Sequence, residues 1–225
     1  MPSCVLYLRQ TGTPSGGTTF RDWGPNHMSF TGSAGAVNST AQYKFSPGAI
    51  HIPGTADYLL SSSYGSYGAY TAPMTVSAWI YISSVGSGYY PICCSMHSGS
   101  APSNGDWLFL ILSNQLRLYR WTGSSSNIYF GLSSGLTINS GAWNHISARW
   151  ISSSSVVFEC NGTTSSVTPT SNTATFSPTT IQGTIIGNVP AVNLGLQGYI
   201  DEVAAFSQSI PNSMFYPPPR RMIVG

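Results

Sequence analysis

Apolar residues recur with a period of two in several segments of this sequence. In Met74–Ile82 (MTVSAWIYI), every second residue from Met74 onwards is apolar. Trp143–Trp150 (WNHISARW) alternates in the same way. Successive side chains of a strand point to opposite faces of a sheet, so this period predicts strands that bury one face. No long window shows the 3.6-residue apolar period of a capped helix, which predicts an all-β protein.

Turn signals divide the apolar segments into hairpins. The apolar run Trp107–Leu112 is followed by Ser113-Asn114 and then by the alternating segment Gln115–Trp121. Ser155–Cys160 ends at Asn161-Gly162, a dipeptide typical of a type I′ hairpin turn before Thr163. Further strands are expected at Val5–Arg9, Met28–Thr31, Ala49–Ile52, Tyr58–Ser61, Thr184–Ile186 and Tyr199–Phe206. With 24 glycines and 15 prolines between short strands, the 225 residues predict one antiparallel two-sheet sandwich.

Charge is scarce, and its scarcity excludes some partners. Only 6% of the residues are charged and the net charge is +2, against about 25% charged residues in a typical soluble domain. A surface with so little charge repulsion suits a subunit of an assembly. The one basic cluster, Arg220-Arg221, is too small to predict nucleic-acid binding. No apolar run is long enough for membrane insertion, and the first residues lack the features of a signal peptide, so we expect synthesis in a reducing cytoplasm.

Six short motifs, in order along the chain, resemble those of the laminin-G-like and pentraxin-like branch of the concanavalin A-like lectin/glucanase superfamily. They are Phe20–Asn26 with the strand Val5–Leu8 before it, Tyr43–Leu59, Met74–Ile82, Gly141–Ile146, Phe158–Thr163 and Gly198–Val203 (GYIDEV). The resemblance implies an antiparallel jelly-roll β-sandwich domain over residues 1–216. It leaves residues 217–225 as an extended, proline-rich C-terminal tail.

The C-terminal residues suggest where such a domain would work. Ser209–Pro219 (SIPNSMFYPPP) is similar to a tail that follows this domain in tailed-phage virion proteins. The resemblance therefore implies a structural protein of the virion surface, of the capsid decoration or cement type, made in the host cytoplasm. Its partners would be other virion subunits or a second copy of itself. The tail would dock through Pro217, Pro218, Pro219, Arg220 and Arg221.

Catalysis is not expected. The acidic residues are Asp22, Asp57, Asp106, Glu159, Asp201 and Glu202. Glycoside hydrolysis needs two facing carboxylates, and the E-x-D-x-x-E pattern of the superfamily's glucanases is absent. The only close pair, Asp201-Glu202, points to opposite faces unless a bulge intervenes. Serine is too common in this chain for any one residue to indicate a nucleophile, and His145 is interpreted as a packed strand histidine.

Aromatic side chains are the best candidates for ligand or partner contact. Tyr64, Tyr67 and Tyr70 are spaced three apart in a glycine- and serine-rich loop, and Tyr89 and Tyr90 end another loop. Trp107 and Trp121 are further candidates. Such rings stack on the apolar faces of sugars, but they suit protein contacts equally well. The alternative function is therefore a carbohydrate-binding module or adhesin that recognises host saccharides.

Metal binding and thiol chemistry have weaker signals. Calcium, the one cofactor considered, would use loop residues such as Asp57, Asn104, Asp106 and Asp201, but so few acids make a site with several carboxylates hard to assemble. The cysteines are Cys4, Cys93, Cys94 and Cys160. Because neighbours on a strand face opposite ways and no C-x-x-C occurs, we expect small buried side chains instead of disulfides or zinc ligands.

Overall fold

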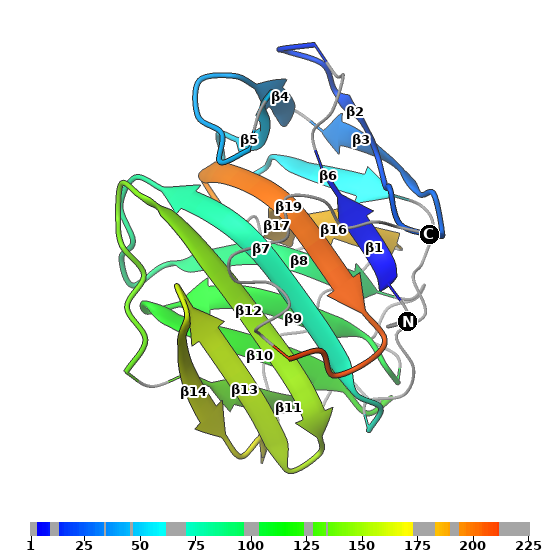
Figure 1. Cartoon of the computed structure of the whole chain (residues 1–225), viewed down its shortest axis with the longest axis vertical. Helices are drawn as coiled ribbons and strands as arrows, with labels where there is room; N and C mark the ends of the chain where they lie inside the picture. Colours follow the sequence, from blue (N-terminus) through cyan, green and yellow to red (C-terminus); the bar gives the residue numbers. More distant parts are fainter. Residues whose placement is uncertain are drawn as a thin grey trace.

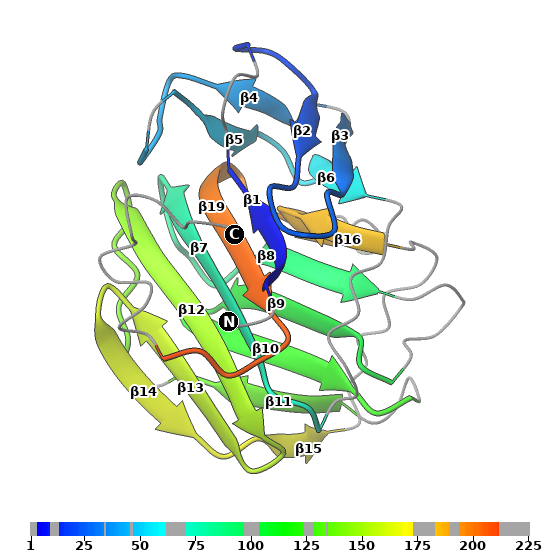
Figure 2. The same cartoon turned by 45° about the vertical axis from the view of Figure 1, so that its right-hand side comes forward.

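The computed structural model describes residues 4–9, 14–33, 35–45, 47–61, 71–96, 104–123, 128–133, 135–172, 183–189 and 194–211. Within these residues the protein contains strands and no helix, and its two main sheets are antiparallel. Figures 1 and 2 show the two sheets stacked face to face. The predicted all-β sandwich is confirmed. The described residues contain no helix that could cross a membrane.

Sheet A is the eight-stranded layer. Its order is β14 (Thr163–Val167), β13 (Ser155–Cys160), β12 (Trp143–Ser152), β7 (Met74–Ile82), β19 (Gly198–Phe206), β5 (Ala49–Ile52) and β4 (Val37–Ser39), and β1 (Cys4–Leu8) also pairs with β19. The last described strand of the chain therefore lies in the middle of the sheet. There it pairs with β1, β5 and β7, which come from much earlier in the sequence.

Sheet B is the nine-stranded layer. Its order is β15 (Thr170–Asn172), β11 (Ile128–Leu132), β10 (Gln115–Trp121), β9 (Trp107–Leu112), β8 (Tyr89–Met96), β16 (Gly183–Ile186), β6 (Tyr58–Ser61), β3 (Ser29–Ser33) and β2 (Thr19–Arg21). A short pair, β17 (Asn188–Val189) and β18 (Leu194–Gly195), packs against β8.

The main core lies between the two sheets and follows the predicted alternation. Every second residue of β7, from Met74 to Ile82, belongs to this core. Trp150 and Phe158 of sheet A meet Phe109 of sheet B there, and all three are fully buried. Burial of large apolar side chains from both inner faces holds the layers together.

The outer face of sheet B is also apolar. Leu108, Leu110 and Trp121 belong to a second buried cluster on this face, while Trp107 faces the main core. Because β9 buries both faces, its sequence is a continuous apolar run instead of an alternating one. Trp107 and Trp121 are both fully buried, so the prediction that their rings contact a ligand or partner is wrong for this structure.

A bulge interrupts β19 on sheet A. The register with β7 shifts between Asp201 and Ala204, and Glu202 has a φ of 49°. Asp201 and Glu202 consequently point to the same, outer face, where Glu202 lies next to Tyr7. The sequence predicted that these two side chains point to opposite faces unless a bulge intervenes, and the bulge is present. After β19 the chain turns back over this face, and Ile210 N–H donates to Oγ1 of Thr75.

The strands expected from sequence are present, and several have the predicted bounds. Ala49–Ile52, Tyr58–Ser61, Met74–Ile82 and Ser155–Cys160 are confirmed, as is the Asn161-Gly162 hairpin turn. The strand Tyr89–Met96 was missed, and only Tyr89 and Tyr90 were considered there, as the end of a loop. Pro91 is accommodated where the register between β8 and β9 shifts. The predicted domain boundary at residue 216 lies outside the described residues.

Candidate functional site

Four rings form a row across the outer face of sheet A, which we call the aromatic row: Trp143, Tyr81, Tyr199 and His51. They come from the adjacent strands β12, β7, β19 and β5 and are direct cross-strand partners. His51 stacks on Tyr199 with ring centroids 4.3 Å apart and planes 13° apart. Tyr81 lies 6.0 Å from Tyr199 and 5.9 Å from Trp143. All four side chains are partly exposed, so the row is a continuous ring surface open to solvent.

The alternation along each strand places the four rings on one face, and a glycine allows β19 to approach β7 closely. Each ring is at an outward position of its strand, because its neighbours in sequence, such as Ile80 and Ile200, belong to the main core. At Gly198 a side chain would clash, since an added Cβ would lie 2.3 Å from the carbonyl oxygen of Tyr81. Burial lowers the pKa of His51, with Asp57 acting in the opposite direction, so a neutral imidazole is favoured in the stack.

The next row of the same face is covered by the segment between β4 and β5. The backbone N–H groups of Lys44 and Phe45 donate to Oδ2 of Asp201 at 3.3 and 3.0 Å. Phe45 meets the Trp79 ring edge-on at 5.8 Å, and Nζ of Lys44 lies 4.2 Å from the centre of that ring. Because Trp79 is two residues before Tyr81 on β7, this segment places an ammonium group beside the aromatic row.

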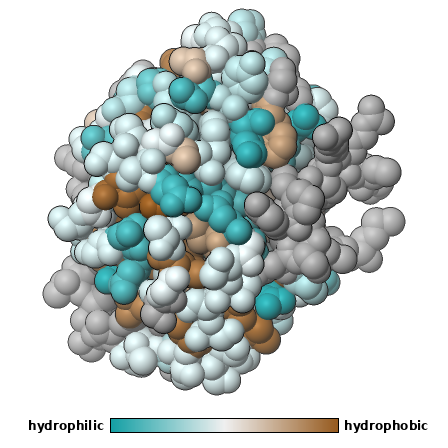
Figure 3. Space-filling model, turned by 60° about the vertical axis from the view of Figure 1, so that its left-hand side comes forward, coloured by the Kyte–Doolittle hydropathy of each residue, from teal (hydrophilic) through white to brown (hydrophobic). Residues whose placement is uncertain are grey.

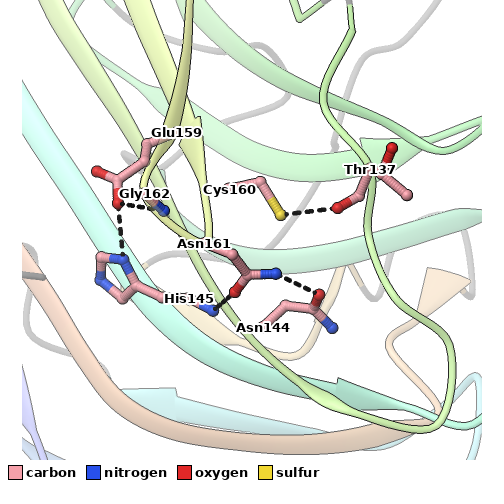
Figure 4. Close-up of polar contacts among 7 residues, drawn as sticks. All are labelled: Thr137, Asn144, His145, Glu159, Cys160, Asn161 and Gly162. Atoms are coloured by element: carbon pink, nitrogen blue, oxygen red, sulfur yellow. Dashed lines mark hydrogen bonds and ion pairs between the residues drawn. The ribbon is translucent and has the colours of Figure 1, made fainter. Parts of the chain in front are cut away.

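A buried polar network fixes the turn between β13 and β14 (Figure 4). Nδ1 of His145 lies 3.4 Å from Oε1 of Glu159, which also accepts the N–H of Gly162 at 3.2 Å. Asn161 accepts the N–H of His145 through Oδ1 and donates through Nδ2 to Oδ1 of Asn144, both at 2.9 Å. His145 and Glu159 are almost fully buried, so the packed strand histidine expected from sequence is present.

The acidic pair on β19 is occupied by internal contacts. Both oxygens of Asp201 accept backbone N–H groups, and the side chain is 1% exposed. Burial raises the pKa of Asp201 to about 7, although those N–H donors oppose the shift. Glu202 accepts a hydrogen bond from Tyr7 and lies 3.6 Å from Nε of Arg9. Burial also raises the pKa of Glu202, against the charge of Arg9. These contacts assign both carboxyl groups a role in tying β19 to its neighbours.

The residues that were predicted to contact a ligand or partner differ in position and exposure. Tyr89 begins β8 and is 40% exposed, whereas Tyr90 packs against the main core and accepts the N–H of Gly86 at its hydroxyl. These tyrosines therefore begin a strand, directly after the loop that they were predicted to end. The remaining predicted contact and docking residues lie outside the described residues: Tyr64, Tyr67, Tyr70, Pro217, Pro218, Pro219, Arg220 and Arg221.

The acids considered for calcium lie at separate places. Asp57 is buried and accepts the N–H of Gly35 at 2.7 Å, Asp106 is buried where β9 begins, and Asp201 is on the outer face of sheet A. In the part of the chain that the structure describes, no three His, Cys, Asp or Glu side chains form a group suited to a metal ion. Calcium binding remains an untested prediction, and the described residues offer it no preassembled site.

Comparison with known families now identifies the chain. The family model Laminin_G_3, described as the concanavalin A-like lectin/glucanases superfamily, matches residues 53–213. The chain belongs to this family. The family named from sequence motifs is thereby confirmed at the level of the superfamily. No curated protein matches this Laminin_G_3 chain.

Solved structures with the same fold include clostridial toxin domains. The binding domain of botulinum neurotoxin DC in complex with SialylT has a TM-score of 0.61 at 12% identity, over 95% of this chain and 50% of that one. The binding domain of Paraclostridial Mosquitocidal Protein 1 gives 0.62 at 14%, over 94% and 50%. The ligand-binding domain of botulinum neurotoxin serotype D in complex with N-acetylneuraminic acid gives 0.61 at 12%, over 95% and 49%. The Laminin_G_3 chain thus spans about half the length of these structures, and it shares their fold.

Proposed function

We propose that this protein is a non-enzymatic carbohydrate-binding domain and that the aromatic row is its sugar-contacting surface. The observation that carries the proposal is the alignment of Trp143, Tyr81, Tyr199 and His51 in one partly exposed row. Sugar rings present apolar C–H faces that stack on aromatic planes. Two solved structures with this fold are described as complexes with SialylT and with N-acetylneuraminic acid, which supports the choice of ligand class.

The low charge of the chain suits contacts with neutral hydroxyl groups. Figure 3 shows a face on which pale, weakly polar residues predominate, with strongly hydrophilic and hydrophobic residues in small separate patches. Serine, threonine and tyrosine side chains both donate and accept hydrogen bonds, as sugar hydroxyls do. A non-enzymatic role is supported by Asp201, whose two oxygens are held by backbone N–H groups. Cleavage of a polysaccharide that depends on Asp201 or Glu202 would overturn it.

A glycan array followed by calorimetry tests the proposal. We expect selective binding by the unaltered chain and at least a tenfold weaker affinity, roughly 1.4 kcal/mol, in Tyr199→Ala and in Trp143→Ala. The matched control is Trp23→Ala, because Trp23 is 46% exposed and lies outside the row. Near-ultraviolet circular dichroism verifies that each variant is folded. Loss of binding in Tyr67→Ala with full binding in Tyr199→Ala would move the site to residues 64–70. Absence of any glycan binding would refute the proposal.

A place on the virion surface is the second candidate, as a decoration subunit that also contacts host glycans. It is favoured by the near absence of charge, 6% of residues, and by the similarity of Ser209–Pro219 to virion protein tails. Loops and tail would bury area against neighbouring subunits and stabilise the shell by mass action. Mass spectrometry of intact particles, together with saturable binding to undecorated capsids, tests this role. Particles that lack the chain would exclude it.

A further inference from the structure

We infer that the open edge of β14 is the contact between two copies of this chain, which would join their A sheets into one continuous sheet. β14 is the outermost strand of sheet A among the described strands, and both views place it at the border of the molecule (Figures 1 and 2). An open strand edge carries unpaired N–H and C=O groups that can pair with another strand. The inference goes beyond the proposed function and does not depend on it.

The hairpin turn determines which backbone groups face outward. The two-residue turn Asn161-Gly162 makes Cys160 and Thr163 a hydrogen-bonded pair, and such pairs alternate along an antiparallel ladder. The N–H and C=O groups of Thr163, Ser165 and Val167 therefore bond to β13. Those of Thr164 and Ser166 point away from it, and both residues are exposed.

The other described edges are shorter or already occupied. At β4, Asn38 accepts the N–H of Gly16 and donates to the carbonyl oxygen of Gly17, each at 2.8 Å, so that edge is covered. β2 and β15 span three residues each, and β2 ends in the charged Arg21. β14 spans five residues and pairs with β13 without a register shift.

The edge of β14 also lacks the usual protection against pairing. Natural proteins place charged side chains, proline or bulges on exposed edges. No charged residue occurs from Cys160 to Ile200, which includes β14 and β15, and the nearest proline is Pro169, beyond the strand. Two identical uncharged edges repel each other little, so a second copy is the partner that this surface fits.

A two-fold axis at Ser165 satisfies the outward groups. Thr164 of one copy then opposes Ser166 of the other, each as a hydrogen-bonded pair, and the two Ser165 residues face each other at the axis. Because such an axis is perpendicular to the sheet, the outer faces of both A sheets lie on the same side. With strands about 4.8 Å apart and a rise of about 3.4 Å per residue, the two aromatic rows, each five residues along β12 from the level of Ser165, would be about 50 Å apart.

Sedimentation equilibrium of the full chain tests the dimer. The expected mass rises with concentration from 23.9 kDa towards twice that value. Thr164→Lys combined with Ser166→Lys should keep the chain monomeric. Ser153→Lys, in the exposed turn between β12 and β13, adds charge away from the edge and should leave the dimer intact. A mass of one chain up to several hundred micromolar, or a dimer that the paired lysines do not weaken, would overturn the inference.

Cross-linking gives a second test that does not depend on the lysine variants folding. Under mild oxidation Ser165→Cys should yield a covalent dimer, because opposed residues at a non-hydrogen-bonded position lie within disulfide reach. Thr168→Cys should not form a covalent dimer, because residue 168 lies off the axis. Equal cross-linking of both variants, or of neither, would refute the proposed register. Calorimetry with a monovalent sugar separates this inference from the proposed function. The lysine variant should be monomeric and keep its affinity for that sugar, because Thr164 and Ser166 lie on a different strand from every residue of the aromatic row.

Discussion

Oδ2 of Asp201 accepts the backbone N–H of Phe45 at 3.0 Å, although the two residues are 156 positions apart in sequence. This contact holds the segment between β4 and β5 against the outer face of β19. Trp79 is covered as a result, and Lys44 is positioned beside the aromatic row. The carboxyl group is buried, and burial raises its pKa to about 7. The carboxyl group that holds this segment in place therefore also makes folding depend on pH, through its burial.

The stability of the protein should fall as pH rises from about 4 to about 7. In this range the folded state keeps a proton on Asp201 that the unfolded state, with an ordinary pKa near 3.8, has released. Glu202, whose pKa is also raised by burial, acts in the same direction, whereas His51, with a lowered pKa, acts in the opposite one. The side chain in Asp201→Asn cannot ionise. Urea unfolding should therefore show that the free energy of unfolding falls by a few kcal/mol between pH 4 and 8 in the unaltered chain and by less in the variant. Parallel curves for the two proteins would contradict this.

Asn161 should stabilise the β13–β14 hairpin through both its backbone and its side chain. Its φ is 51°, a conformation that costs other non-glycine residues about 1 kcal/mol or more, and its amide group makes two partly buried hydrogen bonds. We expect Asn161→Ala to lower the free energy of unfolding by about 3 kcal/mol and Asn161→Gly by less, because glycine keeps the backbone conformation. Chemical denaturation measures both, with Ser153→Ala as the exposed control. Equal losses in the two variants would rule out the backbone contribution.

Gly198→Ala should push β19 away from β7. The new Cβ would lie 2.3 Å from the carbonyl oxygen of Tyr81, so the backbone must move. We expect a loss of about 2–4 kcal/mol and a changed near-ultraviolet spectrum, because Tyr81 and Tyr199 belong to the aromatic row. Gly86→Ala is the matched control, since its nearest contact would be the hydroxyl of Tyr90 at an ordinary 3.6 Å. A variant at position 198 as stable as this control would show that the strands have room.

The thiols should resist modification in the folded protein. The four cysteines are free, and Cys93, Cys94 and Cys160 are buried. Burial raises the pKa of Cys160 to about 11 and that of Cys4 to about 12, so the reactive thiolate is rare near neutral pH. Ellman's reagent at pH 8 should label them only after denaturant is added. Rapid labelling of the native chain would show that a thiol is accessible.

Patterns local in sequence predicted most of sheet A and its core. The alternation in Met74–Ile82 and the Asn161-Gly162 turn gave strands and a hairpin that match the structure closely. Tyr89–Met96 was missed, because only its two tyrosines were considered, as the end of a loop. Trp107 and Trp121 were proposed as contact residues because a continuous apolar run does not show that both faces of a strand are buried.

The aromatic row was not predicted because it depends on strand order. Tyr81 and Trp143 are recognisable as outward residues of their own strands, but His51 and Tyr199 join them only through pairings between distant segments. Nothing in the alternation fixes which strands are neighbours or how they are aligned. The outward position of a tryptophan and two tyrosines on separate strands was the one available signal.

The central position of β19 in sheet A also determines when this protein can fold. β19 lies between β5 and β7, so these two strands cannot be joined into one sheet until Gly198–Phe206 is available. β1 pairs with the same strand. During synthesis on the ribosome, the apolar inner faces of these earlier strands must therefore wait until residues 198–206 have emerged. Until then, the nascent chain exposes apolar surface and unpaired strands that are prone to aggregate.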